Sequence, residues 1–444
     1  GSSSLVTSAR PLAGSPSQVY YDGAALVEVG SLAEVSPGRF FVDYATGRLH
    51  IGSNPTGHLV EASTLEIGAN VNGHAGSALR GLEFKRYATS VKNIAAVRAW
   101  SDNMIVENVT ATDNAYAGIS TIGNNISVLN STMSRNGCLG GHSYQSNGLT
   151  WARNNSSGNN SEGFNVSWEA GGFKMTKSRN VVIEDSWIHD NRANGFWLDQ
   201  SAENLTLRRN TISDNDRSGV MLELSGRIRV IGNLISRNGR YGLYSNNSND
   251  IDAWNNIVVD NSTDVHLLDD RTRSITNLSS SDHDKRYPIP NPSLFWESKN
   301  IRVINNVIGD TAKAEKWASP ALVAYDDNGD RYSFRKRGFE FDANRYFQRR
   351  SGSAAAFSSL DDSPNRTVVS AGFDQHRAAT GMDATSQSAV GDVSPWTTGE
   401  GTTIRSAATG GRQMPSAVAA DLGVKEGSRD IGIPSTVPTP TLQK

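Results

Sequence analysis

Two acidic residues, Asp199 and Glu223, end two stretches of the same pattern, Gly195-Phe-Trp-Leu-Asp and Gly219-Val-Met-Leu-Glu. If the 24 positions from 199 to 223 make one turn of a solenoid, the two side chains lie on adjacent strands, roughly 4.8 Å apart. Carboxylates this close repel each other, which raises at least one pKa and favours protonation near neutral pH. One carboxylic acid beside one carboxylate is the pair that cleaves glycosidic bonds, so we predict that both are catalytic. The alternative is a pair of ordinary surface acids screened by water.

Short strands would have to position this pair, and the sequence repeats a strand-like pattern. A glycine followed by alternating apolar and polar residues recurs at spacings of 23, 22, 32, 24 and 23 residues. Such a period, without a helical pattern, predicts a β-solenoid. Three short strands per turn favour an all-β fold, a right-handed parallel β-helix. The repeated glycines are Gly118, Gly141, Gly163, Gly195, Gly219 and Gly242.

An asparagine stands four residues before most of these glycines or their equivalents. This column predicts a ladder of side-chain amides that bond from turn to turn along the axis. Its members are Asn114, Asn159, Asn191, Asn215, Asn238 and Asn261.

Alternation along each strand places every second side chain on the outer surface. One predicted outward column is Ser120, Ser143, Asn165, Trp197, Met221 and Tyr244, and the other is Ile122, Gln145, Ser167, Asp199, Glu223 and Asn246. Amides bind sugar hydroxyls, and aromatic rings stack on the C–H faces of sugars. We therefore expect substrate-binding roles for Trp197, Tyr244, Asn246, Asn165 and Gln145. His142 falls on the inward phase and is predicted to be structural.

The 32-residue step indicates an insertion of about eight residues, which we place after Ser167. Loops on one face of a repeat often form the binding face. Trp168, Glu169 and Lys174 would then reach the carboxylates and bind substrate. Lys174 would hold a carboxylate ionised or, in a lyase, act as the base; a solvated lysine on a flexible loop is the alternative.

The chain divides into three regions by its pattern. Residues 1–75 lack the period, and a hairpin predicted at 40–51 favours a small β cap on the first coil. Residues 76–310 form the predicted helix, with a long excursion at 270–299. Residues 311–444 form a less regular C-terminal region, with a short helix near 373–386 and a proline-rich tail.

Composition excludes several classes of protein. The formal net charge of −2 gives no field that favours nucleic acid, and no apolar run is long enough for a membrane span. A single cysteine, Cys138, permits neither an intramolecular disulfide nor a cysteine zinc cluster. No phosphate-binding loop, metalloprotease motif or calcium loop is present, so we expect no metal and no cofactor. We interpret the opening Gly-Ser-Ser-Ser as a cloning remnant and expect any signal peptide to have been removed.

The stretches Glu169-Ala-Gly-Gly-Phe-Lys, Asp190-Asn-Arg-Ala-Asn-Gly-Phe-Trp-Leu-Asp and Gly219-Val-Met-Leu-Glu-Leu-Ser resemble the right-handed parallel β-helix superfamily of carbohydrate-active proteins. The chain looks like a large bacterial group within it. The acid pair is similar in kind to that of inulin fructotransferases. The resemblance covers residues 80 to 310 and implies a secreted or cell-envelope bacterial protein with a polysaccharide or oligosaccharide partner. Homotrimers are compatible with this class.

Three functions remain open from the sequence. The first is a glycoside hydrolase or intramolecular transglycosylase that uses Asp199 and Glu223. The second is a polysaccharide lyase or uronate epimerase, which needs positive groups and a base for the C5 proton. The third is a non-catalytic glycan-binding β-helix.

Overall fold

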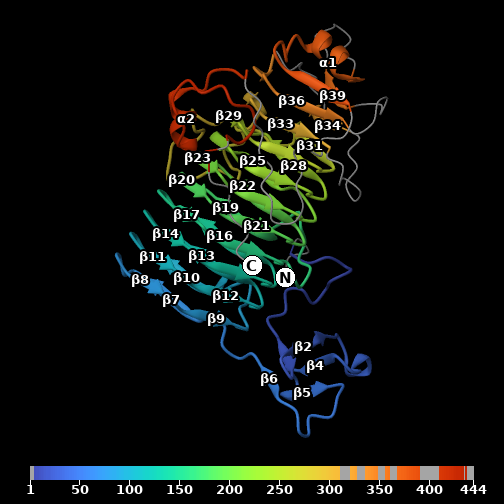
Figure 1. The fold of residues 1–444 in the computed structure, drawn as a ribbon. Coiled ribbons are helices and arrows are strands. Elements are labelled where there is room, and N and C mark those ends of the chain that lie inside the picture. Colours follow the sequence, from blue (N-terminus) through green and yellow to red (C-terminus); the bar gives the residue numbers. More distant parts are fainter. Residues whose placement is uncertain are drawn as a thin grey trace.

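The computed structural model describes residues 5–310, 321–327, 336–348, 356–360, 368–390, 410–434 and 436–437. Within these ranges the chain winds into coils, and each coil adds one strand to each of three long sheets (Figure 1). Adjacent strands within each sheet are parallel and in register, apart from one antiparallel strand, β38 (Val368–Ala371), at the end of the first sheet. The predicted all-β parallel β-helix is confirmed.

The first sheet, called here the site sheet, holds the glycine-led strands of the repeat together with strands that lack the glycine. They are β7 (Ala69–Asn72), β10 (Ala95–Trp100), β13 (Ala117–Thr121), β16 (Leu139–Tyr144), β19 (Gly171–Thr176), β22 (Asn194–Asp199), β25 (Val220–Glu223), β28 (Tyr241–Asn246), β31 (Thr263–Asp269), β34 (Ala321–Asp327) and β37 (Phe357–Leu360).

The second sheet follows the turn after each of these strands. It contains β8 (Ala78–Arg80), β11 (Ile105–Glu107), β14 (Ser127–Leu129), β17 (Thr150–Ala152), β20 (Arg179–Glu184), β23 (Glu203–Arg208), β26 (Gly226–Ile231), β29 (Asn249–Trp254), β32 (Lys299–Ile304) and β35 (Glu340–Asp342).

The third sheet completes each coil. It contains β9 (Glu83–Lys85), β12 (Thr110–Thr112), β15 (Thr132–Ser134), β18 (Asn155–Ser157), β21 (Trp187–His189), β24 (Thr211–Ser213), β27 (Leu234–Ser236), β30 (Ile257–Val259), β33 (Val307–Gly309), β36 (Arg345–Gln348) and β39 (Gln387–Val390).

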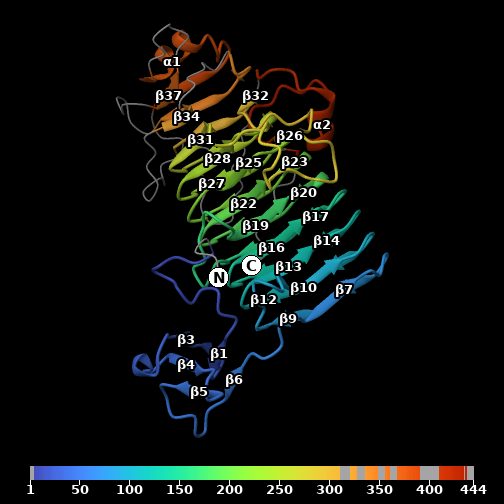
Figure 2. The ribbon, with the colours of Figure 1, turned by 180° about the vertical axis from the view of Figure 1, so that it is seen from behind.

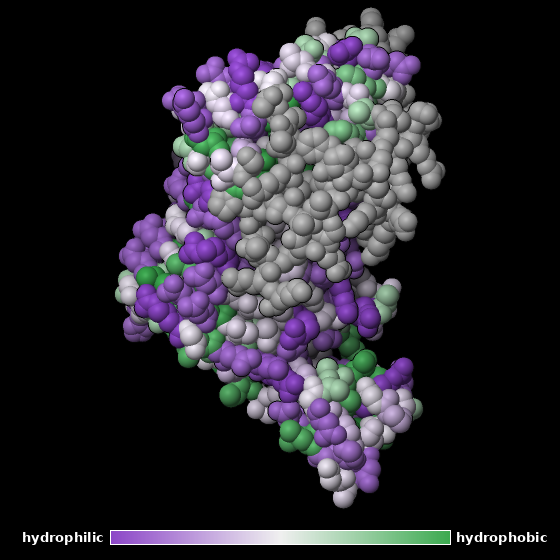
Figure 3. All heavy atoms as spheres, viewed as in Figure 1, coloured by the Kyte–Doolittle hydropathy of each residue, from purple (hydrophilic) through white to green (hydrophobic). Residues whose placement is uncertain are grey.

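Columns of apolar side chains fill the space between the three sheets. On the site sheet Phe173, Phe196 and Val220 stack in one inward column and are almost completely buried. The ring of Trp151 stacks on Phe173 with 4.2 Å between ring centroids. Each fully buried side chain of this size contributes about 1.5–3 kcal/mol. On the view of Figure 3, hydrophilic side chains cover most of the described outer surface.

The predicted asparagine ladder is present, and it is longer than predicted. Its side chains bond from coil to coil at 2.8 to 3.0 Å in the order Asn114, Asn136, Asn159, Asn191, Asn215, Asn238 and Asn261. Asn136 was missed because the glycine of its coil was assigned one residue too late. A second ladder, which we did not predict, runs through Asn210, Asn233, Asn256, Asn306 and Asn344.

Two glycines of the predicted alignment are assigned incorrectly. Gly140 and Gly172, not Gly141 and Gly163, align with Gly195, since Phe173 pairs with both Gly141 and Phe196. Gly141 lies in the inward column, where an added Cβ would come within 2.6 Å of the Trp151 ring.

The insertion therefore precedes its strand. β18 and β19 are joined by residues 158–170, 13 residues, where the next coil uses the four residues 190–193. This segment is called here the insertion loop. Lys174 follows it and lies on β19.

The excursion between β31 and β32, residues 270–298, runs beside the turns that join the site sheet to the second sheet. Arg286 donates hydrogen bonds to the carbonyls of Gln145 and Lys177, and the Arg286 and Arg179 guanidinium groups both lie over the Tyr287 ring. The excursion also packs Leu294 and Trp296 into a small buried cluster. Because it crosses several coils, it forms a wall along one edge of the site sheet.

The N-terminal unit contains β1 (Val19–Tyr21), β2 (Ala24–Ala25), β3 (Val27–Glu28), η1 (Leu32–Glu34), β4 (Arg39–Asp43), β5 (Arg48–Ile51) and β6 (Val60–Ala62). The predicted hairpin is β4–β5, which pair antiparallel. The unit lies near the first coils, at the opposite end from α1 (Phe373–Thr380) (Figure 1).

In the three long sheets, parallel pairing begins at β7, inside the range 1–75, and continues past residue 310 to β39. The helix α2 (Ser416–Leu422) packs beside β26 (Figure 2). The three-region division stays a prediction. Among the described residues, no helix is long and apolar enough to span a membrane.

Candidate functional site

The centre of the site sheet carries two columns of outward side chains. Register pairs His142 with Lys174, Lys174 with Trp197, and Trp197 with Met221. The second column runs from Tyr144 through Thr176 to Asp199, and Glu223 pairs with Asn246 on the following strand. Leu198 pairs with Leu222, so Asp199 and Glu223 occupy successive positions of one column, on adjacent strands.

Asp199 is held by groups that stabilise its negative charge. Its Oδ2 lies 3.1 Å from Lys174 Nζ, and its Oδ1 accepts a hydrogen bond of 2.7 Å from the amide of Gln200. The Asp199 and Lys174 side chains are only 9% and 8% exposed, so water screens the pair weakly.

Glu223 has the opposite electrostatic environment. Burial and the nearby charge of Asp199 raise its pKa to about 7, against smaller opposing effects of Lys174, Arg273 and Trp197. Trp197 Nε1 donates a 3.1 Å hydrogen bond to its Oε2, and Asn246 Nδ2 donates a 3.2 Å bond to Oε1. Near neutral pH Glu223 is therefore a carboxyl that can donate a proton.

Lys174 connects the strand to the insertion loop. Its ammonium group donates a 2.9 Å hydrogen bond to the carbonyl of Trp168 and lies 3.5 Å from the centroid of the Trp197 ring. The predicted contact between Lys174 and a carboxylate is present, but a strand positions Lys174, whereas the sequence analysis placed it in an inserted loop. Lys174 projects from β19 in register with Trp197, so the sheet fixes it and not a flexible loop.

The insertion loop supplies a second wall. Glu169 Oε1 lies 3.8 Å from Nε2 of His142, and Cys138 Sγ donates a 2.8 Å hydrogen bond to the carbonyl of Glu169. Burial lowers the pKa of His142, although Glu169 acts in the opposite direction. His142 Nδ1 also lies 3.2 Å from Ser120 Oγ.

The excursion supplies the facing wall and brings in an arginine. Arg273 lies 3.7 Å from Glu223 Oε1 and 3.0 Å from Asp282 Oδ2. Together these elements enclose a cleft of about 350 Å³, called here the acid-pair cleft. It is lined by His142, Tyr144, Ser167, Trp168, Glu169, Lys174, Thr176, Trp197, Asp199, Gln200, Glu223, Arg273 and Asp282.

The structure brings most of the predicted site residues together in this cleft. Asp199, Glu223, Lys174, Trp197, Trp168 and Glu169 all line it. Asn246 touches it through its bond to Glu223. Trp197 is only 4% exposed, and Lys174 covers one face of its ring. The contacts of Trp197 therefore orient Lys174 and Glu223.

Besides Asn246, three predicted binding residues lie outside the lining. Tyr244 is 6% exposed and packs against Tyr241 and His266. The alignment that gave Gln145 and Asn165 outward column positions is wrong. Gln145 lies in the turn after β16, and Asn165 lies in the insertion loop, where its side chain bonds the amide of Ser167.

Sequence reasoning did not place the imidazole of His142 or the guanidinium group of Arg273 in the cleft. His142 was predicted to point inward, but a one-residue error of register moves a side chain to the other face of a strand. The double glycines 140–141 and 171–172 carried the signal for the correct register. Arg273 comes from a segment without periodicity, so no sequence pattern placed it.

Comparison with known proteins gives a partial family match. The family described as "Periplasmic copper-binding protein (NosD)" matches residues 143–310. In the described part of the chain, no group of three or more His, Cys, Asp or Glu side chains is placed to hold a metal ion. None of the curated proteins matches the chain.

Solved structures with similar folds include carbohydrate-active proteins. The structure of XylC with xylose matches at a TM-score of 0.53 and 14% identity, covering 75% of this chain and 64% of that one. An alginate epimerase AlgG, described as periplasmic, matches at 0.42 and 18% identity, covering 57% of this chain and 60% of that one. The Azotobacter vinelandii mannuronan C-5 epimerase AlgE6 A-module matches at 0.46 and 18% identity, covering 63% and 70%.

This chain thus spans less than two thirds of the length of XylC. At such low identity the likeness shows the fold, and the match to XylC agrees with the sheet topology. The chain is a parallel β-helix protein.

Proposed function

We propose that the protein is a glycoside hydrolase or an intramolecular transglycosylase that acts on a polysaccharide or oligosaccharide bound in the acid-pair cleft. One observation carries the proposal: two carboxyl groups on adjacent strands have opposite surroundings. Asp199 faces an ammonium group, whereas burial and Asp199 itself raise the pKa of Glu223 to about 7. Pairs of titratable groups whose environments separate their pKa values are typical of an acid and its partner base or nucleophile.

The roles follow from this difference. The protonated carboxyl of Glu223 donates its proton to the leaving glycosidic oxygen while the Asp199 carboxylate attacks the anomeric carbon. The strand spacing of roughly 4.8 Å is close to the separation of about 5 Å typical of such retaining enzymes. In the second step, the Glu223 carboxylate takes a proton from the attacking hydroxyl. Water as acceptor gives hydrolysis, and a hydroxyl of the same glycan gives a cyclic product.

Removal of either carboxylate tests the proposal. We expect Asp199→Asn and Glu223→Gln each to lower turnover about 10²–10⁴-fold, measured as new reducing ends or cyclic products from a panel of bacterial and plant glycans. Glu107→Gln is the matched control, because this acid lies on the second sheet and pairs with Arg80. Full activity in both cleft variants contradicts the assignment.

A second candidate, polysaccharide lyase or uronate epimerase, has a specific observation in its favour. Lys174 and Arg273 line the same cleft, and positive groups there would stabilise the charge that forms when a base removes the C5 proton of a uronate. A lyase leaves an unsaturated product that absorbs ultraviolet light, and an epimerase exchanges the C5 proton with solvent deuterium. A hydrolase does neither, so these two assays separate the candidates.

We also propose that the protein works outside the cytoplasm. The partly matching family is described as periplasmic, and polysaccharides of the size that a surface groove accommodates are abundant there. Fractionation of the native host, with an antibody against the protein, tests this; recovery only in the cytoplasmic fraction contradicts it.

A further inference from the structure

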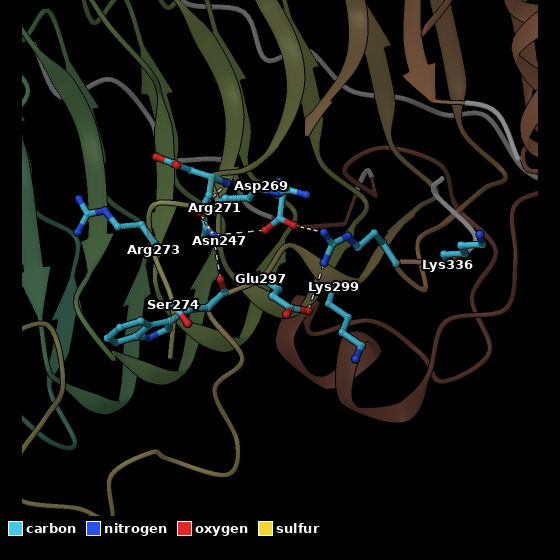
Figure 4. A pocket seen from close by; sticks show the side chains of 11 residues that line it. Asn247, Asp269, Arg271, Arg273, Ser274, Glu297, Lys299 and Lys336 are labelled. Carbon is cyan, nitrogen blue, oxygen red and sulfur yellow. Dashed lines mark hydrogen bonds and ion pairs between the residues drawn. The ribbon is translucent and has the colours of Figure 1, made fainter. Parts of the chain in front are cut away.

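Arg273 lies where two clefts meet. Besides the acid-pair cleft, it lines a second cleft of about 420 Å³, formed by later turns of the helix and by both ends of the excursion (Figure 4). Its Nη1 lies 3.0 Å from Asp282 Oδ2, and its Nη2 lies 3.7 Å from Glu223 Oε1. The aspartate thus holds one side of the guanidinium group while the other side faces the acid.

A turn at the start of the excursion fixes the backbone of Arg273. The carbonyl of Asp270 accepts a 3.2 Å hydrogen bond from the Arg273 amide, and Asp270 Oδ1 accepts one of 2.8 Å from the Thr272 amide. Such bonds set the shape of a turn. The direction of the turn relative to the site sheet depends on contacts outside it.

Asn247, in the preceding coil, supplies this outside contact. Its Nδ2 donates a 2.9 Å hydrogen bond to the carbonyl of Asp270, the oxygen that also accepts from the Arg273 amide, and its Oδ1 accepts one of 2.8 Å from the Asp270 amide. Nδ2 also donates a 2.8 Å bond to the carbonyl of Trp296, at the other end of the excursion (Figure 4). Asn247 is buried, where hydrogen bonds are stronger than in water. One amide therefore joins both ends of the excursion and holds the turn that carries Arg273.

Charged and titratable groups face Glu223 from several elements. Burial and Asp199 raise its pKa, whereas Lys174 and Arg273 lower it. Tyr244, on the next strand, is close enough that burial and Glu223 both raise the pKa of its phenol. Lys174 pairs with Asp199 at 3.1 Å, so of the two cations Arg273 is the one directed at Glu223.

The proposed reaction turns Glu223 into an anion after its first step. When the proton of Glu223 passes to the leaving oxygen and the glycosidic bond breaks, Asp199 bonds to the anomeric carbon and loses its charge. The negative charge then resides on Glu223, beside Arg273. Arg273 keeps all its protons, and Glu223 takes a proton back from the acceptor hydroxyl in the second step.

We propose that Asn247 is a positioning residue for this acid: it fixes the turn that directs Arg273 at Glu223, and Arg273 stabilises the carboxylate left after proton donation. The role in turnover rests on the proposed function. The effect on Glu223 does not, because the contacts are present without a glycan.

Titration of Glu223 without substrate tests the effect of Arg273. Infrared spectra with ¹³C-labelled glutamate, taken for each variant minus the same variant carrying Glu223→Gln, give the midpoint of this one carboxyl. Arg273→Gln should raise the midpoint by about 0.5 pH unit or more, since a unit charge about 4 Å away contributes that much even in bulk water. Arg302→Gln is the matched control, because this arginine is similarly exposed and pairs with Asp252 on the second sheet. It should leave the midpoint unchanged.

Asn247→Ala should raise the midpoint by about 0.2 pH unit or more, because the turn is released while the charge is kept. In the Arg273→Gln background the same change should have no further effect, since Asn247 acts through Arg273. Asn255→Ala is the matched control: this buried asparagine has a similar left-handed backbone, and its Nδ2 donates to the carbonyls of Asp430 and Gly432. Asn247→Ser gives the same comparison if the alanine variant does not fold.

An unchanged midpoint in Arg273→Gln or in the Asn247 variant overturns the proposal. An equal shift from the Asn247 variant with and without Arg273 overturns it as well. If the protein cleaves a glycan, the alkaline limb of kcat/KM should move with each midpoint. Shifted midpoints without cleavage of any glycan support the positioning role and contradict the proposed function. Cleavage with unshifted midpoints supports the proposed function and overturns the positioning role.

Discussion

At the scale of the residue, the chemistry depends on how unequally two carboxyl groups are surrounded. Trp197 matters here because its Nε1 donates to Glu223 while its ring lies against the ammonium of Lys174. The indole thus lowers the pKa of Glu223 from one side and positions the cation that pairs with Asp199 on the other. A small change in the Trp197 side chain should therefore alter the pKa of Glu223 without removing its carboxyl group.

Trp197→Phe removes the hydrogen bond to Glu223 and keeps an aromatic ring. Because that bond lowers the pKa of Glu223, its loss should raise the pKa above about 7. The alkaline limb of the pH profile of kcat/KM should then move to higher pH. Trp187→Phe, on the third sheet, is the control and should leave the limb in place. An unchanged limb in Trp197→Phe would argue against Glu223 as the acid.

Glu223 should also make folding stability depend on pH. Its pKa in the folded protein, about 7, exceeds its ordinary value of 4.5, so the folded state binds the proton more tightly. Stability is therefore greatest below pH 4.5 with respect to this group and falls as the pH rises through 7.

Glu223→Gln removes this loss and should stabilise the protein at alkaline pH, by up to about 3 kcal/mol. The difference from the native protein in urea midpoint should shrink as the pH falls. A difference that is the same at all pH values would show that Glu223 has an ordinary pKa.

The sequence placed these residues well wherever the repeat was undisturbed. Trp197 and Asp199 lie on one coil and Glu223 lies on the next, 24 residues after Asp199, so simple counting found their columns. His142 was misplaced because Gly140 and Gly141 fit the pattern equally well, and the space filled by Trp151 decides between them. That contact joins residues on different sheets, which a local pattern does not encode.

At the scale of the element, the strands hold the acid pair and two irregular segments enclose it. The insertion loop brings Glu169 and the carbonyl of Trp168, and the excursion brings Arg273. Their lengths were visible in the sequence as interruptions of the period. Their contacts were not, because each depends on single hydrogen bonds to distant turns, such as those of Arg286 to Gln145 and Lys177.

Arg286→Ala should loosen the excursion without disturbing the coils. Hydrogen bonds to charged groups contribute about 1.5–3 kcal/mol each, so cleavage by protease within 270–298 should accelerate about tenfold or more. KM should rise because Arg273 is held less firmly. Arg80→Ala removes an exposed ion pair from the second sheet and serves as control. Equal protease sensitivity of the two variants would show that Arg286 does not hold the excursion against the coils.

At the scale of the whole molecule, the repeating asparagines and glycines set how closely the coils stack. Asn215 accepts from Asn191 at 2.8 Å and donates to Asn238 at 2.9 Å, all buried between coils. The sequence predicted this ladder and the overall fold because both follow directly from the period. The enclosing walls of the site do not follow from it.

Asn215→Ala leaves two buried neighbours without their partner. We expect a loss of about 2–4 kcal/mol in the free energy of unfolding, since each orphaned buried group costs about 1–3 kcal/mol. Thermal or urea unfolding followed by circular dichroism measures it. Asn70→Ala, at an exposed asparagine of β7, should change stability by less than about 0.5 kcal/mol. Comparable losses in both variants would mean that the ladder contributes little.

The protonation state of Glu223 tests the account most directly, because no substrate has to be known. Infrared spectra of the native protein with ¹³C-labelled glutamate, minus those of Glu223→Gln, isolate this carboxyl as pH is varied. The account predicts a protonated carboxyl band that disappears with a midpoint of about 7. A midpoint near the ordinary value of 4.5 would contradict it, because Glu223 would then have no proton to donate at neutral pH.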